Sequence, residues 1–128
     1  MLKPLVRSLR VGQFAVAVCI FTYVALMPAS MIRTEQTDST LHFAGNLLLF
    51  LSAWLACYGR FNIGVLLLAL VPYSLTIELA QWLAPTRFVD RHDMLANGLG
   101  LATGALIAFV ADRILLRFPR VRSYLTKH

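Results

Sequence analysis

Polar side chains that could carry chemistry interrupt an otherwise apolar sequence at a few regularly spaced positions. Three pairs of them stand three or four residues apart, a spacing that places both members on the same face of a helix. The pairs are His42 with Asn46, Glu78 with Gln81, and Asp93 with Asn97. Glu78 is the best candidate for a general base, and His42 or Asp93 is its candidate partner in proton transfer. These three residues are therefore the catalytic candidates.

The stretch between the last two pairs adds charged side chains. Arg87, Asp90 and Arg91 all lie within the six residues before Asp93. Arginine suits phosphate groups because its planar guanidinium can donate two parallel hydrogen bonds. We expect a polar pocket with these charged residues at its rim. The candidate ligand-binding residues are Gln81, Arg87, Asp90, Arg91, Asn97 and Asn46.

Each of these residues also has a plainer explanation. Glu78 could be a structural clasp between helices, because an acid in lipid must find a partner or stay protonated. Asp93 could serve as the N-cap or first residue of a helix. Donor atoms suitable for a metal occur on His42, Glu78, Asp90, His92 and Asp93. These donors lack a local ligand spacing, so the sequence predicts neither a metal nor a cofactor.

The composition places these residues in a membrane protein. Apolar residues make up 59% of the 128-residue chain and charged residues only 14%, whereas soluble domains carry about 45–50% and about 25%. Four apolar segments, at residues 11–27, 41–58, 63–83 and 93–116, are each long enough to cross a bilayer as a helix. The sequence predicts an all-α membrane protein: one domain, residues 1–128, with four transmembrane helices in a small antiparallel bundle.

The positive charge predicts how this bundle is oriented. Nine of the twelve Lys and Arg residues lie on the side that would hold both termini and the second turn. Cytoplasmic flanks carry such an excess, so we expect both termini to be cytoplasmic and the polar pairs to lie at the outward end. The first segment also has features of a signal peptide, and its cleavage is the alternative. The net charge is +6, but the Lys and Arg residues lie at the ends of apolar segments and do not cluster with aromatic residues. No nucleic-acid partner is therefore expected.

Small residues recur every four positions in the fourth segment. They are Ala96, Gly100, Gly104 and Ala108. Such a stripe lets a second helix approach closely, so we assign Gly100 and Gly104 to helix packing. The second segment, with Gly45 among its small residues, is the expected partner.

The combined pattern resembles the VanZ-like family of small bacterial integral membrane proteins. The matching residues are Glu78-x-x-Gln81, then Arg87-x-x-Asp90-x-x-Asp93-x-x-x-Asn97-x-x-Gly100-x-x-x-Gly104, with His42-Phe43 upstream. Family members often carry an Asp-Lys pair shortly before the His-Phe pair, but this chain has Asp38-Ser39 and lacks the Lys. The resemblance implies a multi-pass protein of the bacterial cytoplasmic (inner) membrane. The family's founding member is associated with resistance to teicoplanin, a glycopeptide with a lipid tail.

Three kinds of function are compatible with the sequence. The first is binding or modification of an amphiphile in the outer leaflet, with membrane lipids, lipid-linked envelope precursors or an amphiphilic antibiotic as partners. The second is proton- or ion-coupled transport through Glu78 and His42, for which four short helices would need to form an oligomer. The third is a non-catalytic membrane subunit whose polar cluster only specifies helix packing. An outward-facing pocket at head-group depth favours the first.

Overall fold

The computed structural model describes residues 2–31, 35–83 and 91–126, and every regular element within these ranges is a helix. The long helices are α1 (Leu2–Ala25), α2 (Glu35–Ala56), α3 (Ile63–Trp82) and α4 (Arg91–Leu115). The short ones are the 3-10 helix η1 (Ala29–Met31) and α5 (Pro119–Thr126). All four long helices have the length and composition to span a membrane, which confirms the predicted all-α membrane class.

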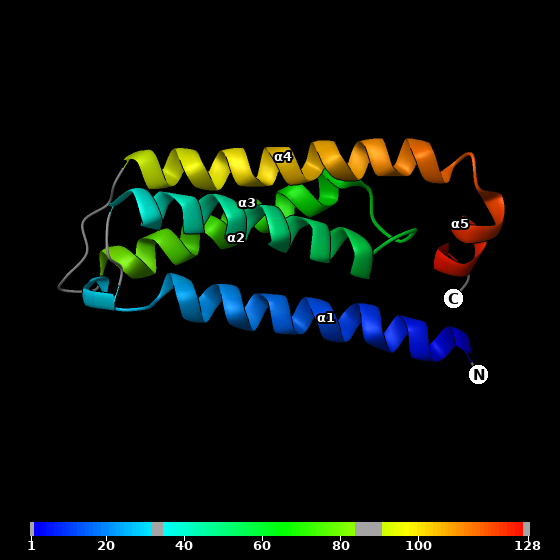
Figure 1. Ribbon diagram of the computed structural model, residues 1–128, viewed down its shortest axis with the longest axis horizontal. Coiled ribbons are helices and arrows are strands. Elements are labelled where there is room, and N and C mark those ends of the chain that lie inside the picture. The colour runs from blue at the N-terminus through cyan, green and yellow to red at the C-terminus, as the bar shows by residue number, and fades with distance from the viewer. Residues whose placement is uncertain (1, 32–34, 84–90, 127–128) are drawn as a thin grey trace.

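The long helices alternate in direction, so the bundle is antiparallel (Figure 1). Both termini lie at one end, where α5 also packs, and α2 and α4 begin at the other end. The termini therefore lie on the same side, as the sequence predicts. That this side is cytoplasmic stays a prediction from the charge distribution.

Two of the helices begin well before the apolar segments that indicated them. α1 begins nine residues before its apolar segment and α2 begins six residues before its own. Backbone hydrogen bonds continue through polar residues outside the hydrocarbon, whereas hydropathy marks only the stretch that matches the lipid. As a result Asp38 and Ser39 lie on α2, one turn before His42 and Phe43.

Large apolar side chains point outward around the bundle. Leu68 is 76% exposed, Leu106 63% and Leu48 60%. Soluble monomers rarely expose contiguous apolar patches above a few hundred Å², whereas the same side chains would be well solvated by lipid tails. The middle of the bundle is also apolar, and Leu49 and Phe50 of α2 are almost completely buried. The exposed residues therefore form the lipid-facing surface of a multi-pass membrane protein.

Helices α2 and α4 share the most extensive contact in the bundle. Gly100 of α4 lies against the α2 backbone, and a Cβ at this position would collide with the carbonyl oxygen of Phe43 and approach the Cβ of Asn46 to 2.9 Å. At Gly104 the added Cβ would lie 2.8 Å from the Cβ of Phe50. Both glycines thus lie where the two helices approach most closely, and α2 is the partner that the sequence predicts.

The small residue expected on α2 faces a different helix. An added Cβ at Gly45 would lie 2.7 Å from the ring of Phe21 on α1. The α4 stripe instead packs against larger α2 residues, because glycine on one helix alone leaves room for a side chain on the other. Gly45 therefore serves the packing of α1 on α2.

A buried arginine of α1, Arg10, stabilises the end of the bundle at which both termini lie. The Arg10 guanidinium donates to the carbonyl oxygens of Leu55 at 2.6 Å, of Ala56 and Tyr58 at 3.3 Å, and of Leu125 at 2.7 Å. The last carbonyls of a helix have no partner within the helix, so Arg10 caps α2. Its contact with Leu125 also joins α5 to the bundle.

The contact at Gly100 can be tested with a matched pair of glycines. Gly100→Ala should lower the free energy of unfolding by about 1–3 kcal/mol, because the new methyl group forces the α2 and α4 backbones apart. Gly98→Ala is the control, since nothing lies within 4 Å of a Cβ at Gly98, and alanine favours the helix by about 1 kcal/mol. Thermal unfolding of the purified protein in detergent measures both. Equal destabilisation by both variants would contradict the assigned contact.

Candidate functional site

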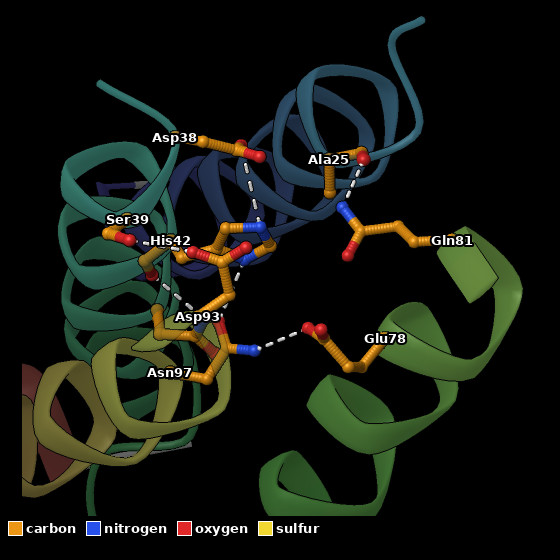
Figure 2. Close-up of polar contacts among 9 residues, drawn as sticks. Ala25, Asp38, Ser39, His42, Glu78, Gln81, Asp93 and Asn97 are labelled. Carbon is orange, nitrogen blue, oxygen red and sulfur yellow. Dashed lines mark hydrogen bonds and ion pairs between the residues drawn. The ribbon is translucent and has the colours of Figure 1, made fainter. Parts of the chain in front are cut away.

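Polar side chains from three helices meet at the end of the bundle opposite the termini. α2 contributes its second and third turns, α3 its last two turns and α4 its first two turns. The side chains point toward one another between these helices (Figure 2). Five predicted site residues are buried here, none with more than 8% of its surface exposed: His42, Asn46, Glu78, Asp93 and Asn97. The antiparallel topology brings them together because the starts of α2 and α4 lie beside the end of α3.

The centre of this cluster is the side-chain amide of Asn97. Its Oδ1 lies 2.7 Å from Nδ2 of Asn46 and 2.9 Å from Nδ1 of His42. Its Nδ2 donates to Oε2 of Glu78 at 3.0 Å. Asn97 therefore joins α4 to both α2 and α3. Glu78 accepts its hydrogen bond inside the bundle, where a polar residue of a membrane helix is expected to find a partner.

The direction of these hydrogen bonds follows from one backbone group. Asn46 lies 2.9 Å from the carbonyl oxygen of His42, and a carbonyl can only accept, so the contacting atom of Asn46 is its amide nitrogen. The same nitrogen faces Asn97, which must present its oxygen. His42 must then donate to that oxygen from Nδ1. In a neutral imidazole this leaves Nε2 without a hydrogen.

Two residues of the preceding α2 turn complete the cluster. Ser39 donates from Oγ to Oδ1 of Asp93 at 2.7 Å. Asp38 places Oδ1 3.6 Å from Nε2 of His42. Neither residue is among the predicted site residues, although Asp38 stands four positions before His42 and so shares its face. The carboxyl groups of Asp38 and Asp93 therefore lie close to the imidazole, and that of Glu78 is linked to it through Asn97.

Asp93 lies deeper in α4 than the sequence suggested. The helix begins at Arg91, so Asp93 is its third residue and belongs to the first turn rather than to the N-cap position. A carboxylate in the first turn is still favoured by the helix dipole. Asp93 is nevertheless buried, and its partner is the Ser39 side chain of another helix, which goes beyond what capping requires.

The remaining predicted binding residues have different surroundings. Gln81 is buried, and its Nε2 donates to the carbonyl oxygen of Ala25, which ties the end of α3 to the end of α1. Arg91 is exposed at the start of α4. Arg87 and Asp90 lie outside the described residues. Of the three predicted rim residues, the structure thus describes only Arg91, which lies at the surface beside the exposed His92.

An apolar groove runs between α1 and α2 and ends at the polar cluster. Its volume is about 190 Å³. It is lined by Ile20, Phe21, Val24, Ala25, Leu41, Ala44, Gly45 and Leu48, with Asp38 and His42 at its polar end. Typical pockets for whole small molecules hold about 300–1,000 Å³, so the groove fits a chain segment better than a whole ligand. This groove was not predicted from the sequence, because it depends on how α1 packs against α2.

Comparison with known proteins identifies the family of the chain. A family model described as VanZ/LLP1 matches residues 6–115. The chain belongs to the VanZ family. Comparisons with curated proteins and with solved structures give no match. The VanZ match reaches from the first turns of α1 to the end of α4 and includes every residue of the cluster.

Within this VanZ-family fold the cluster has an imidazole, three carboxylates, two amides and a hydroxyl. Such a set can exchange protons, accept hydrogen bonds from hydroxyl or amine groups, or hold a cation. Within the described ranges, no Lys or Arg side chain forms an ion pair with Glu78 or Asp93. The described part of this cluster is therefore rich in carboxyl groups without a Lys or Arg counter-charge.

The contribution of the Asn97 hydrogen bonds to stability can be tested with Ser74 as the control position. Asn97→Leu removes contacts to His42, Asn46 and Glu78, and hydrogen bonds between membrane helices contribute about 0.6–1.7 kcal/mol each. We expect Asn97→Leu to lower the free energy of unfolding by about 1–3 kcal/mol. Thermal unfolding of the purified protein in detergent measures this loss. Ser74 is equally buried, but its hydroxyl has no partner among the described residues. Ser74→Ala should therefore be neutral or stabilising, and similar losses in both variants would refute the network.

Proposed function

We propose that this membrane protein binds an amphiphile, such as a lipid-linked envelope component, with its polar head at the cluster and its chain in the α1–α2 groove. The observation that carries this proposal is the continuity of the two surfaces. Asp38 and His42 belong to both the polar cluster and the lining of the apolar groove. A ligand that occupies both must be polar at one end and apolar at the other.

The groove supports a ligand that arrives from the membrane. Ile20 and Leu48 line it and are also about 60% exposed, so it opens at the lipid-facing surface. An acyl or isoprenoid chain could enter sideways without crossing water. Burial of apolar surface contributes little in this setting, because lipid tails are as apolar as the groove. Selectivity must then come from the head group.

The polar end supports a head group with hydrogen-bond donors. Carboxylates accept hydrogen bonds, so Glu78 and Asp93 suit the hydroxyl groups of a sugar or an amine. A phosphate would be repelled by these acids but would suit an arginine such as Arg91 at the exposed start of α4. A lipid-linked sugar phosphate carries both chemistries: its sugar offers hydroxyls to the carboxylates, and the phosphate that joins the sugar to the chain would be bound by the guanidinium. Glu78 and His42 would be the groups that move a proton if the head group reacts.

The core favours binding over transport. Of the buried side chains described between the polar cluster and Arg10, only Ser74 is polar. A proton or ion path needs successive polar groups or water along its length. Leu49, Phe50 and Leu70 fill this part of the bundle instead. Among the described residues the buried carboxylates and the imidazole thus lie at one end, as expected for a site that serves one leaflet.

The proposal can be tested by filling the groove. Ala44→Phe places a ring among the groove residues and should weaken binding of an isoprenoid phosphate at least about tenfold, or about 1.4 kcal/mol. Ala102→Phe adds the same ring to an exposed position on α4 and should leave binding unchanged. Native mass spectrometry of protein in detergent, with isoprenoid phosphate or phosphatidylglycerol added, gives the bound fraction directly.

A second variant tests the head-group end of the same ligand. Arg91→Ala should weaken isoprenoid phosphate but leave an isoprenoid alcohol unaffected, because only the phosphate needs the guanidinium. Unchanged affinity in Ala44→Phe would remove the groove from the proposal. Unchanged affinity in Arg91→Ala would remove the phosphate contact and leave the apolar part standing.

A further inference from the structure

The geometry points to a site for a divalent metal ion, formed by the side chains of Asp38, His42 and Asp93. One ligand atom from each lies within 4.8 Å of the other two. His42 and Asp93 are buried, and the residues come from two different helices, α2 and α4 (Figure 2). The sequence shows no ligand spacing for a metal because the third donor is brought in by the α2–α4 contact.

The His42 ring is already oriented as a metal ligand. The Nδ2 of Asn46 donates to the His42 carbonyl and to Oδ1 of Asn97. Because Asn97 thus presents its oxygen, Nδ1 of His42 donates to it. In the neutral imidazole the lone pair of Nε2 is then on the side of the Asp38 carboxylate. A ligating histidine usually donates its other ring N–H to an oxygen in this way, which fixes its tautomer and its orientation.

The distance between His42 and Asp38 suits a shared ion better than a direct hydrogen bond. Nε2 and Oδ1 are 3.6 Å apart, whereas an N–H···O hydrogen bond measures about 2.7–3.2 Å. Two ligands held about 2.1 Å from a tetrahedral ion stand about 3.4 Å apart. The observed separation is close to that value. Small rotations of the two carboxylates would bring all three donors to bonding distance.

The carboxylate on α4 is held in place as well. Ser39 donates to Oδ1 of Asp93, so one oxygen is anchored and the Asp93 carboxylate is kept beside the imidazole. Ligating carboxylates are commonly supported by such hydrogen bonds. The hydroxyl of Ser39 and the amide of Asn97 thus hold the two buried ligands from opposite sides.

The donor set indicates the class of ion. One imidazole with two carboxylates suits zinc or a related first-row divalent cation. Three protein ligands leave at least one position for water or for an oxygen of a bound molecule. The ion would also offset the negative charge of Glu78 and the two aspartates. This inference goes beyond amphiphile binding and is tested without any lipid ligand.

The test titrates metal-free protein in detergent with Zn²⁺ against a chromophoric chelator. We expect one tightly bound Zn²⁺ per chain. His42→Gln and Asp93→Asn should each weaken binding at least tenfold, and Asn97→Ala about 10–100-fold by releasing the imidazole. His92→Gln is the matched control, because His92 lies in the same helical turn as Asp93 but is exposed.

The two cysteines need their own control because thiolates bind zinc. Cys19 is exposed and Cys57 is half-buried, so the double variant Cys19→Ser, Cys57→Ser should bind Zn²⁺ as the wild type does. Absence of binding in wild type, loss of binding in the cysteine variant, or unchanged binding in both His42→Gln and Asp93→Asn would each overturn the proposal.

A spectroscopic measurement decides the matter if the ligand variants fail to fold. Co²⁺ added to the wild-type protein should give the visible bands of a low-coordinate nitrogen and oxygen site, without the near-ultraviolet band of a thiolate ligand. Zn²⁺ should displace it and abolish those bands. A spectrum identical to that of aqueous Co²⁺, or one with the thiolate band, would refute the Asp38–His42–Asp93 site.

Discussion

The close approach of α2 and α4 at Gly100 is the constraint on which the rest of the structure depends. A side chain at that position would collide with the carbonyl oxygen of Phe43, so the two backbones come as near as glycine allows. Asn97 lies one turn before Gly100 on the same face of α4. The short separation of the helices is what lets its amide reach both His42 and Asn46 on α2. Packing and polar chemistry are thus determined by one contact.

The hydrogen bonds of the polar network have a fixed donor-to-acceptor order across the three helices. It starts at the backbone carbonyl of His42, which can only accept, and continues through Asn46 and Asn97 to Glu78. Each amide has one donor side and one acceptor side, so a choice made at the first contact fixes all the others. The orientation of the imidazole is a consequence of helix geometry on α2. It does not depend on the carboxylates that surround the ring.

The sequence carries much of this information but not all of it. The four spans follow from apolar length, and the convergence of His42, Glu78 and Asn97 follows from antiparallel topology with polar pairs at matching helix ends. Asp38 and Ser39 were not selected because hydropathy places the start of α2 too late. The α1–α2 groove and the bond from Gln81 to Ala25 depend on helix rotation, which a sequence with little amphipathic pattern does not specify. The roles of Arg87 and Asp90 stay predictions.

A purely structural cluster would not need this composition. Asparagine pairs alone can hold membrane helices together at small cost, and the contacts of Asn46 and Asn97 already do so. Glu78 and Asp93 add buried carboxylates, which are expensive within a membrane unless protons or cations accompany them. The Oδ1 of Asn46 is buried without a partner among the described residues, at a cost of about 1–3 kcal/mol. These costs fall at one end of the bundle, where an apolar groove reaches the same residues, and this coincidence supports the proposal that a ligand binds there.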